Sequence, residues 1–150
     1  DVHKFVKGKS LTIGGVLIRC DYGLEGHSDA DVLIHSIIDA LLGASSLGDI
    51  GKHFPDTDDK FKDINSRDLL RDVIKKLKLN NYNVGNIDAT IICETPKMQP
   101  YISQMKTNIA DDCKCNLNDI NIKATTTEKL GFIGRSEGIA AQAICLINQI

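Results

Sequence analysis

The sequence has no tryptophan, and its aromatic residues make up only 5% of 150 residues. So few rings do not favour an aromatic platform on which nucleic-acid bases stack. Charge of one sign is not in excess either, because the sequence has 18 Lys and Arg and 20 Asp and Glu, which gives a net charge of -2. A nucleic-acid-binding protein is typically basic, and an acidic tail is typical of disorder. We therefore expect a folded protein with no nucleic-acid partner.

Long hydrophobic runs are also missing. The apolar runs, such as the three residues from Ile91 to Cys93, fall far short of the roughly 20 apolar residues that span a bilayer. We expect no membrane partner. The opening residues show no signal-peptide pattern, and the five cysteines are an odd number, so we expect reduced thiols. Hydrophobic residues make up 42%, enough for the core of a single domain over residues 1–150.

Helical and strand patterns alternate along the chain. The patterns predict a strand or hairpin over 11–20, strands over 84–94, 118–127 and 138–150, and helices over 28–46, 66–79 and 100–113. Ser66 is expected to cap the second helix. The last strand is nearly all apolar, and we expect it to be well buried. This order predicts an α/β or α+β fold with one sheet covered by helices.

The first cluster of reactive side chains joins the start of the chain to the first expected helix. Asp1 and His3 alternate by two, so both side chains point the same way on an extended segment. His35 lies in the middle of the helix, one turn before Asp39. Two imidazoles and a carboxylate suit Zn2+ with an open fourth position, and Asp39 could orient a ligand. A partly buried structural histidine beside a frayed terminus is the plainer alternative.

A second cluster combines Gly26-His27-Ser28 with two later loop segments, 48–51 and 54–58. His27 and Ser28 are expected at a helix N-terminus, where backbone N–H groups favour anions. Three aspartates in the loops offer carboxylates to sugar hydroxyls or to a metal. Taken alone, the residues favour the ordinary alternative, in which Gly makes turns and Asp makes caps.

A third cluster lies at the end of an expected strand, from Ala124 to Lys129. Three consecutive threonines offer hydroxyl and N–H groups to phosphate oxygens, and Glu128 could hold a hard cation such as Mg2+ beside them. A β-branched strand followed by a charged turn is the alternative, and strand composition alone favours it. The phosphate-binding patterns G-x-G-x-x-G and G-K-[ST] are both missing.

Taken together and in this order, the clusters resemble one enzyme family. The matching segments are DVH at 1–3, GHSDADVLIH at 26–35, DALLGA at 39–44, GDIG at 48–51, FPDTD at 54–58, PKM at 96–98 and KATTTEKLGF at 123–132. The chain resembles the 2-C-methyl-D-erythritol 2,4-cyclodiphosphate synthases of non-mevalonate isoprenoid biosynthesis. The match runs to about residue 138, and its HSDADV and ATTTEKLGF segments are highly specific.

The resemblance implies a homotrimer of α/β subunits whose sheets face the centre, with active sites between neighbouring subunits. It also implies a metal-dependent phosphorus–oxygen lyase. In its reaction, the 2-phosphate of 4-diphosphocytidyl-2-C-methyl-D-erythritol 2-phosphate attacks the β-phosphate, CMP leaves, and a cyclic diphosphate forms. Because the nucleophile belongs to the substrate, positioning and charge neutralisation carry the catalysis.

Site residues follow from the resemblance position by position. It places Zn2+ on Asp1, His3 and His35, places Mg2+ or Mn2+ on Glu128, and gives transition-state stabilisation to His27 and Thr126. The implied substrate-binding residues are Asp1, Val2, His3, His27, Ser28, Asp49, Ile50, Gly51, Phe54, Pro55, Asp56, Thr57, Asp58, Phe132 and Arg135. The implied residues for cytidine diphosphate, from the adjacent subunit, are Cys93, Glu94, Thr95, Pro96, Lys97, Met98, Gln99, Thr125, Thr126, Thr127 and Glu128.

Three further expectations concern the surroundings of the site. The family carries a short strand before the Asp-x-His segment, whereas this sequence begins at Asp1, so we expect Asp1 to be loosely held. Arg135 and Glu137 resemble residues at the trimer axis, where a channel is implied for a prenyl diphosphate. Frequent Ile, Asn and Lys indicate an AT-rich genome, and hence a plastid-type organelle (apicoplast or chloroplast) or a bacterial cytoplasm.

Two other functions fit the same residues. One is a metal-dependent phosphoesterase that uses water, for which His27 is the obvious general base. The other is a non-catalytic trimer that binds prenyl phosphates. Retention of both His35 and Glu128 argues against a pure binding protein, which needs no paired metal clusters.

Overall fold

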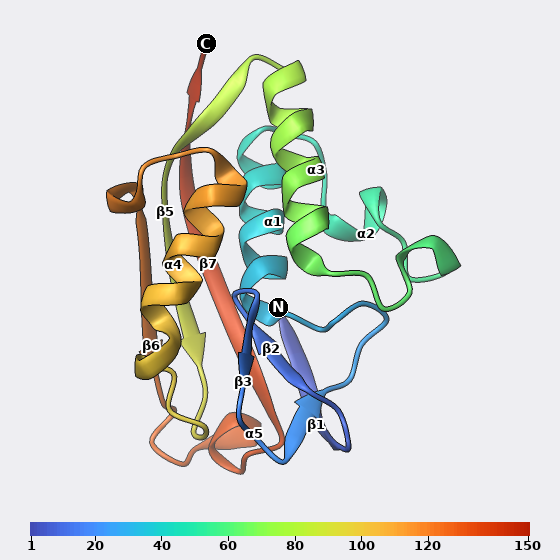
Figure 1. Cartoon of the computed structure of the whole chain (residues 1–150), viewed down its shortest axis with the longest axis vertical. Coiled ribbons are helices and arrows are strands. Elements are labelled where there is room, and N and C mark those ends of the chain that lie inside the picture. Colours follow the sequence, from blue (N-terminus) through green and yellow to red (C-terminus); the bar gives the residue numbers. More distant parts are fainter.

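The computed structural model describes residues 1–150 and contains seven strands, five α-helices and two short 3-10 helices (Figure 1). In chain order they are β1 (Val2–Lys7), β2 (Leu11–Ile13), β3 (Val16–Ile18), β4 (Tyr22–Leu24), α1 (Val32–Ala44), α2 (Ile50–His53), η1 (Asp59–Phe61), α3 (Ser66–Leu79), β5 (Tyr82–Ile92), α4 (Gln99–Cys113), η2 (Leu117–Asp119), β6 (Ile120–Thr125), α5 (Gly131–Gly134) and β7 (Gly138–Gln149). The main helices and strands match the sequence expectation, while β1, β4, α2 and α5 were not predicted.

Five strands form one mixed sheet in the order β4-β1-β7-β5-β6. The β5–β6 pair is parallel, and the β1–β4, β1–β7 and β5–β7 pairs are antiparallel. The remaining strands, β2 and β3, make a separate hairpin, as predicted for residues 11–20. The mixed α+β fold is therefore confirmed.

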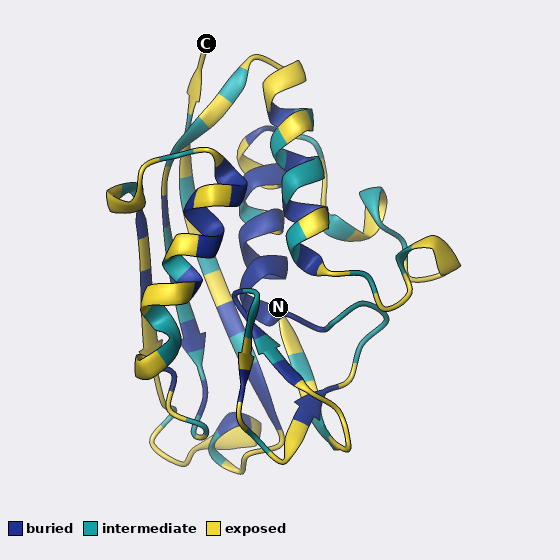
Figure 2. Cartoon of the chain, in the orientation of Figure 1, coloured by how far each residue is buried: buried dark blue, intermediate teal, exposed yellow.

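Helices α1, α3 and α4 lie on the same face of the sheet (Figure 1). The side chains of Ile87, Ala89 and Ile91 point to this face and are at most 1% exposed. Helix α1 lies between the sheet and α3 and is buried along most of its length (Figure 2). Its apolar residues join the inward side chains of the strands in one continuous core. A site residue on α1 is consequently held by packing on several sides.

The opposite face of the sheet is left without a covering layer. On β7, Ile144 and Leu146 are 70% and 68% exposed, whereas their neighbours Cys145 and Ile147 pack against the core. The expectation of a well-buried last strand is therefore wrong for the single chain. Alternate residues of a strand point to opposite faces, and helices cover only one of them.

Asp31 fixes the start of α1. Its carboxylate accepts hydrogen bonds from the backbone N–H of Ile34 at 3.1 Å and from those of Gly14 and Gly15 at 2.9 and 2.8 Å. These contacts join the β2–β3 turn to the helix, and burial raises the pKa of Asp31 to about 6. Because Asp31 is the N-cap, the helix begins at Val32 and not at residue 28 as predicted.

Helices α3 and α4 are joined by a group of charged side chains. Asp112 on α4 is 3% exposed and accepts hydrogen bonds from Arg67 and Arg71 on α3.

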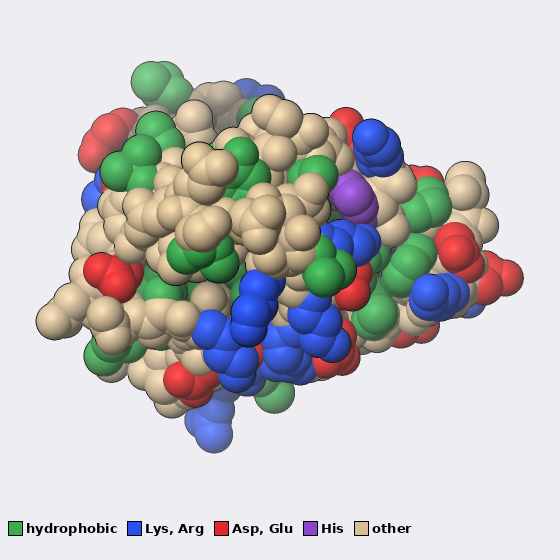
Figure 3. Space-filling view, turned by 90° about the horizontal axis from the view of Figure 1, so that it is seen from above, with side chains coloured by type: hydrophobic (Ala, Val, Ile, Leu, Met, Phe, Trp, Pro, Cys, Tyr) green, Lys and Arg blue, Asp and Glu red, His purple; other side chains and the backbone are tan.

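The N-cap of α3 is Asn65 and not Ser66, whose hydroxyl contacts other residues. In Figure 3, Lys and Arg side chains gather over the end of α3, where Lys76 and Lys78 complement the helix dipole. None of the helices has the length and apolarity needed to cross a bilayer.

Candidate metal centre and substrate cavity

Strand pairing holds the first residue of the sequence in place. The amino group of Asp1 donates to the carbonyl oxygen of Ala141 at 2.8 Å. The N–H of Ala141 donates in turn to the carbonyl oxygen of Asp1 at 2.9 Å. The expectation that Asp1 is loosely held is therefore wrong. These bonds continue the pairing of β1 with β7 and direct the side chains of Asp1 and His3 to the same side, as the alternation predicted.

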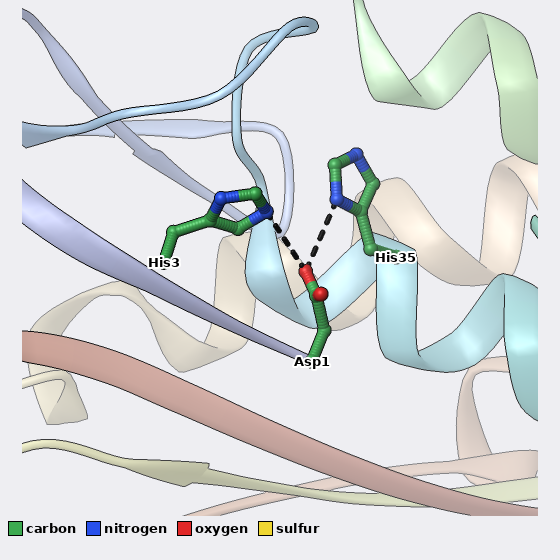
Figure 4. Close-up of side chains that lie close together, drawn as sticks. All are labelled: Asp1, His3 and His35. Carbon is green, nitrogen blue, oxygen red and sulfur yellow. Dashed lines mark hydrogen bonds and ion pairs between the residues drawn. The ribbon is translucent and has the colours of Figure 1, made fainter. Parts of the chain in front are cut away.

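Asp1, His3 and His35 form a compact group of potential metal ligands (Figure 4). Their ligand atoms all lie within 4.8 Å of one another. Asp1 Oδ2 is 3.1 Å from His3 Nε2 and 3.2 Å from His35 Nδ1. Residues far apart in the sequence thus converge as predicted for the first cluster, and the alternative of a frayed terminus is wrong.

The protonation of His3 favours a cation between these atoms. Its Nδ1 lies 2.7 Å from the carbonyl oxygen of Glu25, which can only accept, so Nδ1 carries the proton and Nε2 turns its lone pair toward Asp1. Burial lowers the pKa of His3 and of His35, which keeps both rings neutral. The unprotonated Nε2 of His3 and the carboxylate of Asp1 therefore face one another as two acceptors, which repel unless a positive ion lies between them.

The spacing of the donors fits a tetrahedral ion. Zn2+ binds nitrogen and oxygen at about 2.0–2.2 Å, which places neighbouring ligand atoms about 3.3 Å apart. The observed separations of 3.1 and 3.2 Å are close to that value. The residues present therefore fit a small divalent cation with an open position toward solvent.

The metal ligands lie in a cavity of about 580 Å³ that also takes in most of the second predicted cluster. The residues that line it are Asp1, His3, Gly26, His27, Ser28, His35, Ile50, Gly51, Phe54, Pro55, Asp56, Thr57, Phe61 and Leu69. Phe61 and Leu69 were not predicted, because only the fold brings η1 and α3 to this wall. An apolar wall opposite polar ligands is typical of a small-molecule site.

Five predicted substrate residues do not line this cavity, namely Val2, Asp49, Asp58, Phe132 and Arg135. Val2 is on the other face of β1. Asp49 caps α2 through the N–H of Lys52 at 2.9 Å, and Asp58 caps η1 through the N–H of Lys60 at 3.0 Å. Asp39, predicted to orient a metal ligand, instead accepts from the N–H of Ile50 at 2.8 Å. That prediction is wrong, and Asp39 stabilises the short helix at the cavity wall.

His27 is held by a loop and not by a helix N-terminus as predicted. Its Nε2 lies 3.0 Å from the carbonyl oxygen of Asp58, so Nε2 donates a proton and Nδ1 is the free acceptor. The N–H of Asp63 donates to the carbonyl oxygen of His27 at 2.8 Å. These contacts join the segment before α1 to the loop that closes the cavity.

The third predicted cluster lines a separate cavity of about 230 Å³. The residues that line it are Cys93, Glu94, Pro96, Lys97, Met98, Gln99, Ala124, Thr125 and Thr126. Thr95, Thr127 and Glu128 do not line it, although they belong to the same segments. No residue lines both this cavity and the one at the metal ligands. The two halves of the predicted site are therefore apart in one chain.

Glu94 holds the threonine loop in shape, a role that the sequence did not indicate. Its Oε1 accepts from the N–H of Thr127 and of Lys129, each at 3.1 Å. These bonds lower the pKa of the Glu94 carboxyl. Glu128 and Lys129 have φ angles of 53° and 63°, a left-handed conformation uncommon outside glycine. Backbone held in this way at a loop is typical of functional segments.

The remaining predicted site residues are Cys93, which is buried, and Phe132 and Arg135, which are exposed. Burial raises the pKa of the Cys93 thiol to about 12, which makes it a core residue as predicted. All five cysteines are free thiols. Phe132 and Arg135 line neither cavity described above, and Arg135 Nε donates to Glu137 at 2.6 Å.

Comparisons with known proteins agree with this geometry. The family model of the YgbB family matches residues 1–148. A curated 2-C-methyl-D-erythritol 2,4-cyclodiphosphate synthase from Methylobacillus flagellatus is 61% identical over 149 residues, covering 99% of this chain and 93% of the relative. The chain belongs to the YgbB family of 2-C-methyl-D-erythritol 2,4-cyclodiphosphate synthases. The enzyme class and pathway implied by the resemblance are thereby confirmed for this member of the YgbB family.

Solved structures give the same result for the fold. The synthase from Plasmodium falciparum in complex with CDP is 34% identical, with a TM-score of 0.86, over 99% of this chain and 92% of that one. The bifunctional IspDF protein of Campylobacter jejuni is 45% identical, with a TM-score of 0.96. The match covers all of this chain and 41% of that protein. The fold of this chain is thus the fold of these solved structures.

Proposed function

We propose that this chain converts 4-diphosphocytidyl-2-C-methyl-D-erythritol 2-phosphate into 2-C-methyl-D-erythritol 2,4-cyclodiphosphate and CMP. An oxygen of the 2-phosphate forms a bond to the β-phosphorus, and the bond from that phosphorus to the bridging oxygen breaks. The bridging oxygen leaves with CMP. The observation that carries the proposal is the convergence of Asp1, His3 and His35 within a cavity large enough for the substrate's methylerythritol part.

The metal assignment follows from the donor set. Asp1, His3 and His35 would hold Zn2+, and Glu128 would hold Mg2+ or Mn2+ together with substrate phosphates. When bound, these ions supply Lewis-acid neutralisation of phosphate charge and hold the reacting groups in register. Asp1, His3 and His35 are positioned before substrate arrives, because β1, β7 and α1 fix them through backbone pairing and core packing.

The remaining residues bind and orient the substrate. His27 and Ser28 would contact the 2-phosphate, and the loop from Phe54 to Thr57, with the nearby Ile50, would enclose the methylerythritol part. Thr126 would donate to the phosphate at which the displacement occurs. A fixed set of donors around an internal nucleophile lowers the barrier mainly by orientation and by stabilising charge that develops in the transition state.

A homotrimer completes the site. The metal ligands and the segments 93–99 and 125–128 line separate cavities in one chain. A neighbouring subunit that presents its nucleotide segments to the metal cavity would place the diphosphate between them. The uncovered apolar side chains of Ile144 and Leu146 would then face the centre of the trimer. Arg135 and Glu137 would lie at its axis, where we expect a prenyl diphosphate to bind.

Residues 1–150 would act as one cyclodiphosphate synthase domain. The relatives from Methylobacillus flagellatus and Lachnospira eligens, at 61% and 59% identity, are bacterial proteins. Of the two settings that composition indicates, these relatives favour a bacterial cytoplasm over a plastid-type organelle.

Turnover in water labelled with ¹⁸O distinguishes cyclisation from hydrolysis. We expect ³¹P NMR to show a cyclic diphosphate and CMP in equal amounts, with no ¹⁸O in either product, because the nucleophile comes from the substrate. One ¹⁸O in an open 2,4-bisphosphate or in CMP would contradict the proposal and support a water-using phosphoesterase. Binding without any product would support the prenyl-phosphate-binding alternative.

The trimer has its own test. Variants His35→Ala and Glu128→Gln are each expected to be inactive alone, and a mixture in which subunits exchange is expected to regain part of the activity. Recovery requires that the two residues act from different subunits. A mixture as inactive as its components, with exchange shown by mass spectrometry, would contradict a shared site.

A further inference from the structure

The second ring nitrogen of His35 points away from Asp1 (Figure 4). This atom, Nε2, lies 2.8 Å from the hydroxyl oxygen of Ser66 and 3.1 Å from that of Ser28. Ser66 is the first residue of α3 and is 0% exposed. It does not line the cavity, so its hydroxyl has a different use.

Asp29 determines the direction of the hydrogen bond that Ser66 makes. Asp29 Oδ2 accepts from the N–H of Ser66 at 2.9 Å, and Oδ1 accepts from the N–H of Asp31 at 3.2 Å. Oδ1 also contacts the Ser66 hydroxyl oxygen. A carboxylate only accepts, and a hydroxyl has a single proton to donate. The Ser66 proton is therefore committed to Asp29.

That commitment fixes the tautomer of His35. With its proton on Asp29, the Ser66 oxygen can only accept, so His35 Nε2 must carry the ring proton. The lone pair is then left on Nδ1, the atom 3.2 Å from Asp1 Oδ2. Since a neutral imidazole binds a metal through its unprotonated nitrogen, only this tautomer presents the correct atom to the metal position.

We propose that Ser66 and Asp29 are positioning residues that fix His35 as the Nε2–H tautomer and so prepare Nδ1 to bind the metal. This inference rests on the proposed metal site and adds two residues to it. Carboxylate partners that orient a metal-binding histidine are known to change metal affinity by about 10–100-fold. Here the carboxylate acts through a serine hydroxyl.

Ser28 does not set this direction. Its oxygen accepts from the N–H of Ala30 at 3.4 Å, and no carboxylate binds its hydroxyl proton. Ser28 can therefore either accept from His35 or turn toward the cavity, which it lines. Ser66 has no such freedom, because it is fully buried and bonded to Asp29 through both its hydroxyl and its N–H.

The variant Asp29→Asn tests the direction itself. The amide oxygen can accept from the N–H of Ser66, and the amide nitrogen then donates to the Ser66 hydroxyl. The hydroxyl proton is thereby released to donate to His35 Nε2, and the ring proton moves to Nδ1. Ser66→Ala removes the relay without reversing it. Ser45→Ala is the matched control, since Ser45 is also a buried serine at a helix terminus, directly after α1, but donates only to the carbonyl oxygens of Leu41 and Leu42.

Long-range ¹H–¹⁵N spectra of histidine rings in the metal-free protein report the tautomer directly. We expect the Nε2–H form for His35 in the wild type and in Ser45→Ala, and a shift toward the Nδ1–H form in Asp29→Asn. An Nδ1–H form in the wild type, or an unchanged tautomer in Asp29→Asn, would overturn the proposal. Far-ultraviolet circular dichroism shows that each variant is folded.

Metal affinity provides a second readout. By competition with a chromophoric chelator, we expect Ser66→Ala and Asp29→Asn to bind Zn2+ about 10–100-fold more weakly than the wild type. Their Co2+ complexes should show altered d–d absorption bands, and Ser45→Ala should match the wild type. Equal affinity in all four proteins would overturn the positioning role alone. A wild type that binds no Zn2+ would instead overturn the proposed metal site.

Discussion

The charged group between α3 and α4 predicts that removing the arginines is more damaging than removing the aspartate. Asp112 is 3% exposed and receives three hydrogen bonds, from Arg67 at 2.7 and 3.0 Å and from Arg71 at 2.7 Å. The side chains of Arg67 and Arg71 are 26% and 40% exposed. In Asp112→Ala, the arginines can therefore recover contacts with water. In the double variant Arg67→Ala/Arg71→Ala, the carboxylate stays buried without a partner.

This difference in exposure between the aspartate and the arginines sets the expected loss of stability in each variant. Lost hydrogen bonds to charged groups amount to about 1.5–3 kcal/mol, which we expect for Asp112→Ala. A buried charge left unpaired lowers the free energy of unfolding by about 3–5 kcal/mol, which we expect for the double arginine variant. For a chain of this size, each kcal/mol lowers Tm by about 2–4 °C. Thermal unfolding at a fixed protein concentration measures both, and an equal or larger loss in Asp112→Ala would refute this reasoning.

Three further predictions concern the site and the assembly. His35→Ala removes one metal ligand, so turnover should fall by about a hundredfold or more while ultracentrifugation still shows a trimer; full activity without bound zinc would contradict the assignment. Glu94 has a lowered pKa, so its ionised form stabilises the native loop above pH 4.5 and this contribution is lost on acidification below it. The stability difference between wild type and Glu94→Gln should therefore shrink below pH 4.5 in unfolding experiments, and a constant difference would exclude the role. Ile144→Asp places a charge on the uncovered face of β7 and should yield monomers by light scattering; an intact trimer would show that this face is not the interface.

Periodicity predicted the core elements well, because burial on one face leaves a regular trace in the sequence. Helix α1 and the inward residues of β5 are examples. Two short strands, β1 and β4, left no such trace. Strand β1 has at most half-buried residues, and β4 spans only three, so pairing within the sheet and not local composition defines them.

The convergence of Asp1, His3 and His35 could be predicted because alternation in a strand and position on a helix are local properties. The roles of Asp39 and Ser66 were assigned wrongly for the opposite reason. Asp39 is one helical turn from His35, yet its carboxylate turns to Ile50. Ser66 has the residue type of a helix cap, and Asn65 takes that place while Ser66 contacts His35. Which partner a polar side chain selects depends on packing between distant elements.

We expect the group of Asp1, His3 and His35 to make cyclisation possible through a bound metal. The most direct test is a ³¹P NMR time course with protein stripped of metal by a chelator, first with Mg2+ alone and then with added Zn2+. We predict no product until Zn2+ is added, after which a cyclic diphosphate and CMP appear together. Full turnover of the stripped protein with Mg2+ alone would contradict the claim.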